Sequence, residues 1–163
     1  MKGTKIKELT KEDLDKDLRP LDYIVQKHHG VYAMSVKGSW EKRLPMLKEA
    51  FKTGRYGIIV AVETETDTIC AFLDYWIIHC FVENMNIAFL QNMRVIEYLR
   101  GKGIGTMLVN KFIEIADKRW NCGEVHVMAG KPADEFYSKF GFKYKPSDIY
   151  MEARIEELKK KGE

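Results

Sequence analysis

The chain has 163 residues, of which 45% are hydrophobic, so it is long enough for one globular domain that buries roughly 70% of its unfolded surface. The formal net charge of +3 is compatible with an anionic small ligand, but it is too weak to indicate a nucleic-acid-binding protein. No run approaches the roughly 20 apolar residues of a membrane span, and the N-terminus is polar. We therefore expect a soluble, cytoplasmic protein with neither a membrane nor a nucleic acid as its partner.

The N-terminal third of the chain predicts one strand and two helices. The strand is expected over residues 4–9. Thr10 and Asp13 then stand at the spacing of a helix-capping pair, and a helix is predicted from about residue 11 to residue 29, with a proline that can restart it. A second helix is predicted over residues 39–54, because a serine stands at its start and a glycine at its end.

Three β-rich runs follow, over residues 56–63, 68–80 and 86–96. A short polar turn separates the first two, so they are expected to pair as an antiparallel hairpin. Shortly after the third run, apolar side chains recur every three or four residues, which predicts an amphipathic helix of about 16 residues.

The C-terminal part predicts, in order, a strand, a short helix and two final strands. These segments cover residues 124–129, 133–140, 142–145 and 149–155. We expect a single domain over residues 1–155, followed by a charged tail over residues 156–163. The alternation of helices with strands predicts an α/β (α+β) fold, in which helices cover both faces of a mixed sheet.

The cysteines and the adjacent histidines indicate neither a disulfide nor a metal site. Cys70, Cys80 and Cys122 are far apart in the sequence and odd in number, which is typical of free thiols in a reducing compartment. His28 and His29 are neighbours, so their side chains point different ways and make a poor pair of ligands. We expect no bound metal.

A glycine-rich loop with the sequence RGKGIG, residues 100–105, precedes the amphipathic helix. The N-terminus of a helix presents unpaired N–H groups and a partial positive charge, which together favour an anion. Glycine lets a phosphate approach closely, while Arg100, Lys102 and Thr106 add charge and a hydroxyl group. The loop therefore predicts a site for a pyrophosphate. The alternative is that its glycines only turn the chain.

The loop does not fit two well-known nucleotide-binding motifs. A P-loop requires Gly-Lys-Ser/Thr after four intervening residues, which this chain lacks. A dinucleotide-binding fold places its glycines after the first strand, whereas here the loop follows roughly the fourth predicted strand.

Two segments resemble the GNAT superfamily of acetyl-CoA-dependent N-acetyltransferases. The first is the strand that ends in Met93, Arg94 and Val95, together with the glycine-rich loop and the helix behind it. The second is ADEFYSKFGF, residues 133–142. The resemblance implies the GNAT fold, with a mixed and mostly antiparallel sheet of six to seven strands, and acetyl-CoA (coenzyme A) as the cofactor.

The resemblance also implies which residues bind the cofactor. In this family the loop amides bind the coenzyme A pyrophosphate, and the backbone of the preceding strand pairs with the pantetheine arm. The implied residues are Met93, Arg94, Val95, Arg100, Gly101, Lys102, Gly103, Ile104, Gly105 and Thr106. A backbone N–H around Met93 or Arg94 would hold the thioester carbonyl. Gly130 stands where the family often has an asparagine near the pantetheine arm.

By the same resemblance, Tyr137 protonates the departing thiolate, since a phenol with a pKa of about 10 carries its proton at neutral pH. The alternative is that its ring only packs in the core. His126 is a candidate for the general base, because some members carry a His-Val pair on the equivalent strand. The position of His126 is equally compatible with a histidine that has only a structural role in its strand. Glu83 or Asp74 acting through water, or bulk solvent, are further candidates for the base.

We therefore expect an N-acetyltransferase that transfers the acetyl group directly to a primary amine. The acceptor is a small molecule or a peptide, and the protein is a monomer or a homodimer. Aromatic side chains such as Trp40 and Tyr56 are expected to line the acceptor site. The alternative is a catalytically degenerate GNAT domain that binds acetyl-CoA as a sensor or a scaffold.

Overall fold

The computed structural model describes residues 3–27, 40–129 and 131–144. The chain divides into two compact units, Met1–Met128 and Ala129–Glu163, and each unit is described by itself. The single domain expected over residues 1–155 stays a prediction. In the described ranges, no helix has the length and apolar character needed to cross a membrane.

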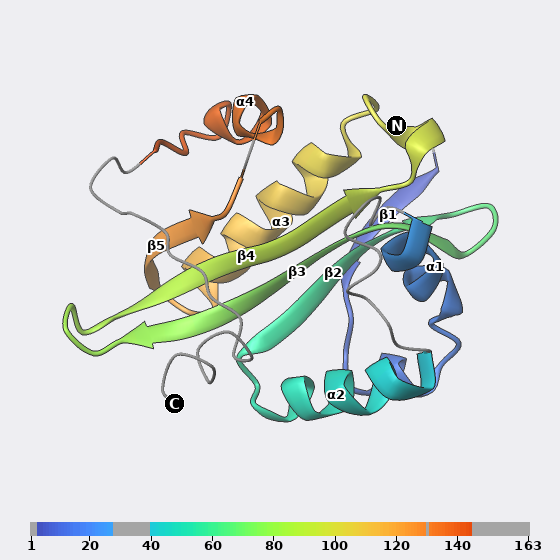
Figure 1. The fold of residues 1–163 in the computed structure, drawn as a ribbon, viewed down its shortest axis with the longest axis horizontal. Coiled ribbons are helices and arrows are strands. Elements are labelled where there is room, and N and C mark those ends of the chain that lie inside the picture. Colours follow the sequence, from blue (N-terminus) through green and yellow to red (C-terminus); the bar gives the residue numbers. More distant parts are fainter. Residues whose placement is uncertain (1–2, 28–39, 130, 145–163) are drawn as a thin grey trace, which may run out of the picture. The chain divides into compact units, whose positions relative to one another are not determined.

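The first unit is built on one five-stranded sheet, whose strands follow one another in chain order (Figure 1). The strands are β1 (Thr4–Glu8), β2 (Tyr56–Glu63), β3 (Thr68–Cys80), β4 (Met85–Val95) and β5 (Cys122–Val127). Neighbours from β1 to β4 pair antiparallel, and β5 pairs parallel to β4. The expected mixed, mostly antiparallel sheet is therefore confirmed.

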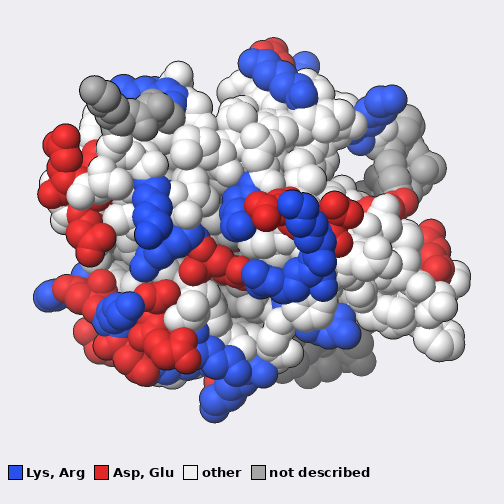
Figure 2. All heavy atoms as spheres, turned by 180° about the vertical axis from the view of Figure 1, so that it is seen from behind, with Lys and Arg blue, Asp and Glu red and all other residues white. Residues whose placement is uncertain are grey.

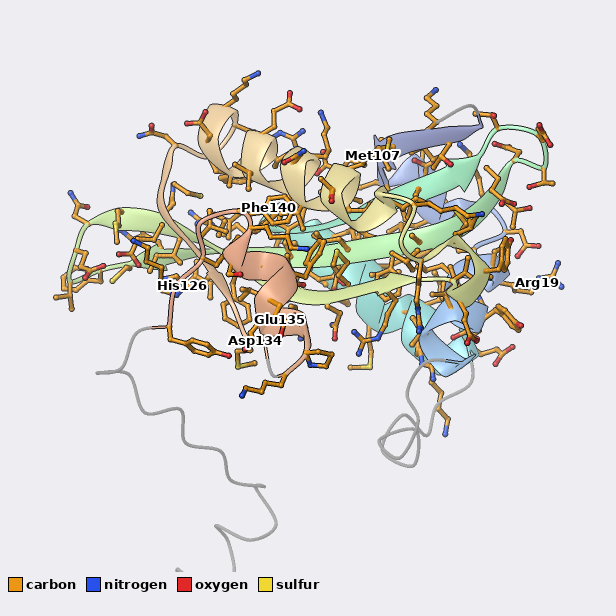
Figure 3. All side chains as sticks on the ribbon, turned by 90° about the horizontal axis from the view of Figure 1, so that it is seen from above. Arg19, Met107, His126, Asp134, Glu135 and Phe140 are labelled. Atoms are coloured by element: carbon orange, nitrogen blue, oxygen red, sulfur yellow. The ribbon has the colours of Figure 1, made fainter. Side chains whose placement is uncertain are left out.

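Helices cover both faces of this sheet. The helical elements of the first unit are η1 (Glu12–Asp15), α1 (Arg19–Lys27), α2 (Trp40–Lys52), η3 (Glu97–Leu99) and α3 (Ile104–Lys118). Figure 3 shows the sheet nearly edge-on, with Met107 of α3 on one side of it and Arg19 of α1 on the other. The second unit contains one described helix, α4 (Ala133–Ser138).

Strand alternation divides the apolar side chains between the two faces. The core under α1 and α2 takes Ile58, Val60 and Val62 from β2. The residues between them point to the opposite face, because successive side chains of a strand alternate. On that opposite face, the ring of Tyr75 from β3 lies 5.5 Å from the ring of Phe112 from α3, measured between centroids.

The expected helix from residue 11 to residue 29 is wrong in its first half. The capping pair exists, since the Thr10 N–H donates to the Asp13 carboxylate at 3.0 Å, but the chain makes only one 3-10 turn before Lys16 becomes extended. Asp17 then accepts the Arg19 N–H at 3.0 Å and provides a new cap for α1. The predicted cap at Ser39 lies outside the described residues.

The expectation of six to seven strands is also wrong for the described residues, which form five. Residues 142–144, expected to begin a strand, have no regular structure. A strand needs a neighbouring backbone for its hydrogen bonds, whereas the exposed Tyr144 uses its hydroxyl to donate to Asp134 of α4 at 2.8 Å. The rest of this segment and the strand expected over residues 149–155 lie outside the described residues.

Candidate functional site

Strand β4 carries a β-bulge near its middle. In the β3–β4 ladder, Tyr75 faces Leu90 while Asp74 faces Asn92, so Gln91 is an extra residue on β4. On its other side, β4 pairs with β5 only as far as Leu90. Within the described ranges, β4 therefore has a neighbouring strand on one side only, from the bulge to its end.

The backbone of Met93 and Val95 points toward this open edge. The next residue, Ile96, donates its N–H to the Cys70 carbonyl on the β3 side at 3.0 Å. Because backbone groups alternate along a strand, Arg94 also points toward β3, and its two neighbours point away. Residues 93 and 95 thus offer N–H and C=O groups that can pair with an extended ligand.

Arginine side chains contact the two outward carbonyls. The guanidinium of Arg94 donates to the Met93 carbonyl at 2.8 Å, and Nε of Arg100 donates to the Val95 carbonyl at 3.2 Å. Side chains rather than a neighbouring strand therefore satisfy these oxygens. A ligand that pairs with this edge would meet two positive charges as well as backbone groups.

The glycine-rich loop connects this edge to α3. Gly101 and Gly103 have φ values of +72° and +77°, in the left-handed region that favours glycine, and α3 begins directly after them at Ile104. The side chain of Ile104 is fully buried and anchors the start of the helix, while Lys102 and Thr106 are exposed. The predicted strand, loop and helix are thus confirmed as an arrangement.

The start of α3 has the character of an anion site. The N–H groups of residues 104–106 belong to the first turn of α3 and precede its first hydrogen bond, which Met107 donates to the Gly103 carbonyl at 3.1 Å. The first turn of the helix contains no acidic residue. Figure 2, which views the molecule from behind, shows Lys and Arg mixed with Asp and Glu rather than gathered into one basic patch. Because no acidic side chain opposes it in the first turn of α3, the start of this helix can attract phosphate groups.

On the opposite face from α3, four side chains form one row across the sheet. Tyr56 faces Trp76, Trp76 faces Phe89, and Phe89 faces His126 of β5. The Tyr56 and Trp76 rings lie 4.7 Å apart between centroids. Nε2 of His126 lies 2.5 Å from a carboxylate oxygen of Glu124, and both side chains are about one-third exposed. The structure thus places His126 on an aromatic surface beside a carboxylate.

Asp74 lies one row further along β3, next to the bulge. Its side chain is buried, with only 6% of the residue exposed. Oδ2 accepts hydrogen bonds from the Tyr56 hydroxyl at 2.9 Å and from the Asn92 amide at 3.4 Å. Burial raises the pKa of Asp74 above its usual value, and these hydrogen bonds partly oppose the rise.

Glu83, the other carboxylate considered for the base, does not share this position. It lies exposed in the turn between β3 and β4. Asp74 is six residues back along β3 from Cys80, the last residue before that turn, which corresponds to about 20 Å along the strand. Asp74 and Glu83 are therefore not parts of one site.

Tyr137 belongs to α4 in the second unit. It is 7% exposed, and its ring lies 5.1 Å from the ring of Phe136 and 5.7 Å from that of Phe142. Ring packing accounts for its burial and says nothing against a role for its hydroxyl. The role of Tyr137 as the acid stays a prediction, and Gly130 lies outside the described residues.

The three cysteines form no disulfide, and His28 and His29 lie outside the described residues. Cys70 is buried, Cys80 and Cys122 are partly buried, and all three are free thiols. Across the part of the chain that the structure describes, no three His, Cys, Asp or Glu side chains are placed to hold a metal ion.

Comparisons with known proteins identify the family. A family model for the acetyltransferase (GNAT) family matches residues 18–142, which is well over half of the chain. No curated protein sequence matches the chain.

Three solved structures show the same fold. Glucosamine-6-phosphate N-acetyltransferase from Arabidopsis thaliana has a TM-score of 0.73 and 21% identity, over 93% of this chain and 98% of that one. An aminoglycoside acetyltransferase from an uncultured soil metagenomic sample has a TM-score of 0.71 and 18% identity, over 93% and 97%. An integron cassette protein of V. cholerae has a TM-score of 0.75 and 20% identity, over 99% of both chains. With the family match, the fold and the strand–loop–helix site in agreement, this chain belongs to the GNAT family of acetyltransferases.

Proposed function

We propose that the protein transfers the acetyl group of acetyl-CoA to a primary amine. The observation that carries this proposal is the open edge of β4, which leads from the bulge into a glycine loop at the N-terminus of α3. Members of the GNAT family use acetyl-CoA as a co-substrate. An edge for an extended amide chain, followed by a site for phosphate groups, fits the two halves of that molecule.

In this proposal the chain holds the cofactor with two sets of groups. The N–H groups of residues 101–106, with Arg100 and Lys102, bind the pyrophosphate. The outward backbone of Met93 and Val95 pairs with the pantetheine arm. When bound, acetyl-CoA supplies the activated acetyl group as a thioester.

The remaining chemistry belongs to the protein. The Met93 N–H, which points toward the open edge, polarises the thioester carbonyl, whereas the N–H of Arg94 points toward β3. The Tyr137 hydroxyl gives its proton to the departing thiolate, because a phenol is protonated at neutral pH. For the base, the sequence leaves His126, Glu83, Asp74 and bulk solvent as candidates.

The acceptor is an amine whose identity the experiment must find. Two of the similar structures are named for acetylation of amino sugars, glucosamine 6-phosphate and aminoglycosides, so amino sugars belong in the first panel. The purified protein is mixed with acetyl-CoA and, in turn, amino sugars, polyamines and peptides, and free CoA is measured with a thiol reagent.

Acceptor-dependent release of CoA supports the proposed transfer. Tight binding of CoA by calorimetry, with no release for any amine of the panel, would instead favour the sensor or scaffold. An absence of CoA binding would contradict both functions.

A further inference from the structure

One carboxylate oxygen is buried in the sheet without a hydrogen-bond partner. Oδ1 of Asp74 makes no hydrogen bond in the described part of the chain, whereas Oδ2 accepts from Tyr56 and Asn92. Both of these side-chain donors are neutral, and no cationic side chain in the described ranges forms an ion pair with this carboxylate. Burial of a carboxylate is costly unless it is paired, and this oxygen still has the capacity to accept a hydrogen bond or a proton.

Asp74 lies on β3, in the row of the sheet where the open edge of the neighbouring strand β4 begins. It faces Asn92, the first residue after the bulge, and β5 stops pairing with β4 just before the bulge. The outward backbone of Met93 and Val95 follows directly. From Val95 back to Asn92 the strand covers about 10 Å, so a chain that pairs with the edge and starts at the loop reaches the row of Asp74.

The competing candidates lie elsewhere. His126 faces Phe89, on the part of β4 that is still paired with β5, and its Nε2 already contacts Glu124 at 2.5 Å. Glu83 is exposed in the turn beyond the end of the β3–β4 ladder. Neither lies in the row of Asp74 and Asn92, which is the row that a chain paired with the open edge reaches.

The described charged groups near this face do not form an ion pair with Asp74. Tyr56 is the titratable group of β2 that contacts it. On α1, which packs against β3 and β4, Asp22 is paired with Arg43 of α2, and Tyr23 is exposed. Burial is the largest influence on the pKa of Asp74, and the hydrogen bonds from Tyr56 and Asn92 oppose it.

We propose that Asp74 accepts the proton that the acceptor amine loses on acetylation, and that Tyr56 and Asn92 hold its carboxylate in position. The inference rests on the proposed acetyl transfer. The amine nitrogen forms a bond to the thioester carbon, the carbon–sulfur bond breaks, and its electron pair leaves with the sulfur. The nitrogen gives one proton to Oδ1 of Asp74, and the thiolate receives one from Tyr137. Asp74 then returns its proton to solvent, and Tyr137 takes one from solvent, so both groups regain their starting state.

The test compares kcat, kcat/KM against pH, and acetyl-CoA affinity in wild-type protein and four variants. Asp74→Asn should keep acetyl-CoA affinity and lower kcat by about 10²- to 10⁴-fold, the usual contribution of a general base. Tyr56→Phe should move the rising limb of kcat/KM to higher pH, because it removes a hydrogen bond that lowers the pKa of Asp74. A purely structural role of Tyr56 would not move the limb.

Glu83→Gln is the matched control, since it neutralises an exposed carboxylate outside the site, and it should behave as the wild type. His126→Ala should keep the limb. If that variant loses the limb instead, His126 is the base and the proposal for Asp74 is overturned. Two acceptors with different amine pKa values are also compared. If the rising limb of kcat/KM moves with the pKa of the acceptor amine, no enzyme group is the base, and the proposal for Asp74 is overturned.

The proposal can fail separately from the proposed function. An active wild type with an equally active Asp74→Asn variant overturns the role of Asp74 and leaves acetyl transfer standing. A wild type that binds acetyl-CoA but releases no CoA with any amine overturns the transfer itself, and the role of Asp74 with it. If Asp74→Asn does not fold, the shift of the limb in Tyr56→Phe decides the question.

Discussion

The ring of Tyr75 fills the space directly beside Gly57, its partner on the neighbouring strand. A Cβ at position 57 would meet two carbons of this ring and its hydroxyl oxygen closer than van der Waals contact allows. The ring itself is held in place, because its hydroxyl donates to Glu8 at 2.5 Å and it packs against Phe112. The glycine is therefore required by the packing of the α3 face of the sheet.

Gly57→Ala should destabilise the fold by about 1–3 kcal/mol, the usual cost of overpacking a core. Urea unfolding measures the loss. Gly123→Ala is the matched control in another strand, because its Cβ would meet the flexible Met85 sulfur at 2.5 Å, which can move away. The steric explanation fails if both variants lose the same stability.

Gly103→Asp should abolish the stabilisation of the protein by acetyl-CoA, because it places a negative charge at the start of α3. A ligand at 100 times its Kd stabilises by about 2.7 kcal/mol, which thermal unfolding with and without acetyl-CoA resolves. Gly54→Asp is the control, since Gly54 has a similar φ of +70° at the end of α2. Both variants should suffer backbone strain, and only the first should lose the ligand effect. An undiminished ligand effect in Gly103→Asp would remove the pyrophosphate from this loop.

Tyr137→Phe should lower kcat by about 10- to 1,000-fold and leave acetyl-CoA affinity nearly unchanged. The variant keeps the ring that packs on Phe136 and Phe142, so the fold should survive. Tyr144→Phe removes another hydroxyl of the same unit, one that donates to Asp134, and should keep wild-type kcat. Equal kcat in the wild type and Tyr137→Phe would leave Tyr137 with a packing role alone.

Asp74→Asn should stabilise the folded protein at neutral pH. The pKa of Asp74 is raised in the folded state, so the folded state binds the proton more tightly than the unfolded chain, and stability falls as pH rises through this pKa. The asparagine variant lacks this cost, so its advantage should be largest near pH 7–8 and should shrink toward about pH 4, the unfolded pKa. Thermal unfolding across this range measures the difference, with Glu83→Gln as the exposed control. A variant that is less stable than the wild type at every pH would show that the carboxylate supports the fold.

The sequence by itself determined the elements whose signals are local. The strand bounds over residues 56–63 and 68–80 agree with β2 and β3, because alternating and continuous apolar runs reflect burial directly. The glycine loop before α3 was predictable because left-handed φ values favour glycine. Two local capping signals compete before α1, the pair of Thr10 and Asp13 and a second cap at Asp17. The sequence pattern did not show that the first of them starts only one 3-10 turn.

Only the tertiary structure decided which side chains meet. Nothing local in β4 marks Gln91 as a bulge, since a bulge is a mismatch between two strands and is defined by the partner's register. Asp74 and Tyr56 are 18 positions apart, and their hydrogen bond exists because β2 and β3 pair in one register. The burial of a carboxylate on β3, one strand away from the open edge of β4, depends on contacts between distant segments, so the sequence named Asp74 only as one of several candidates.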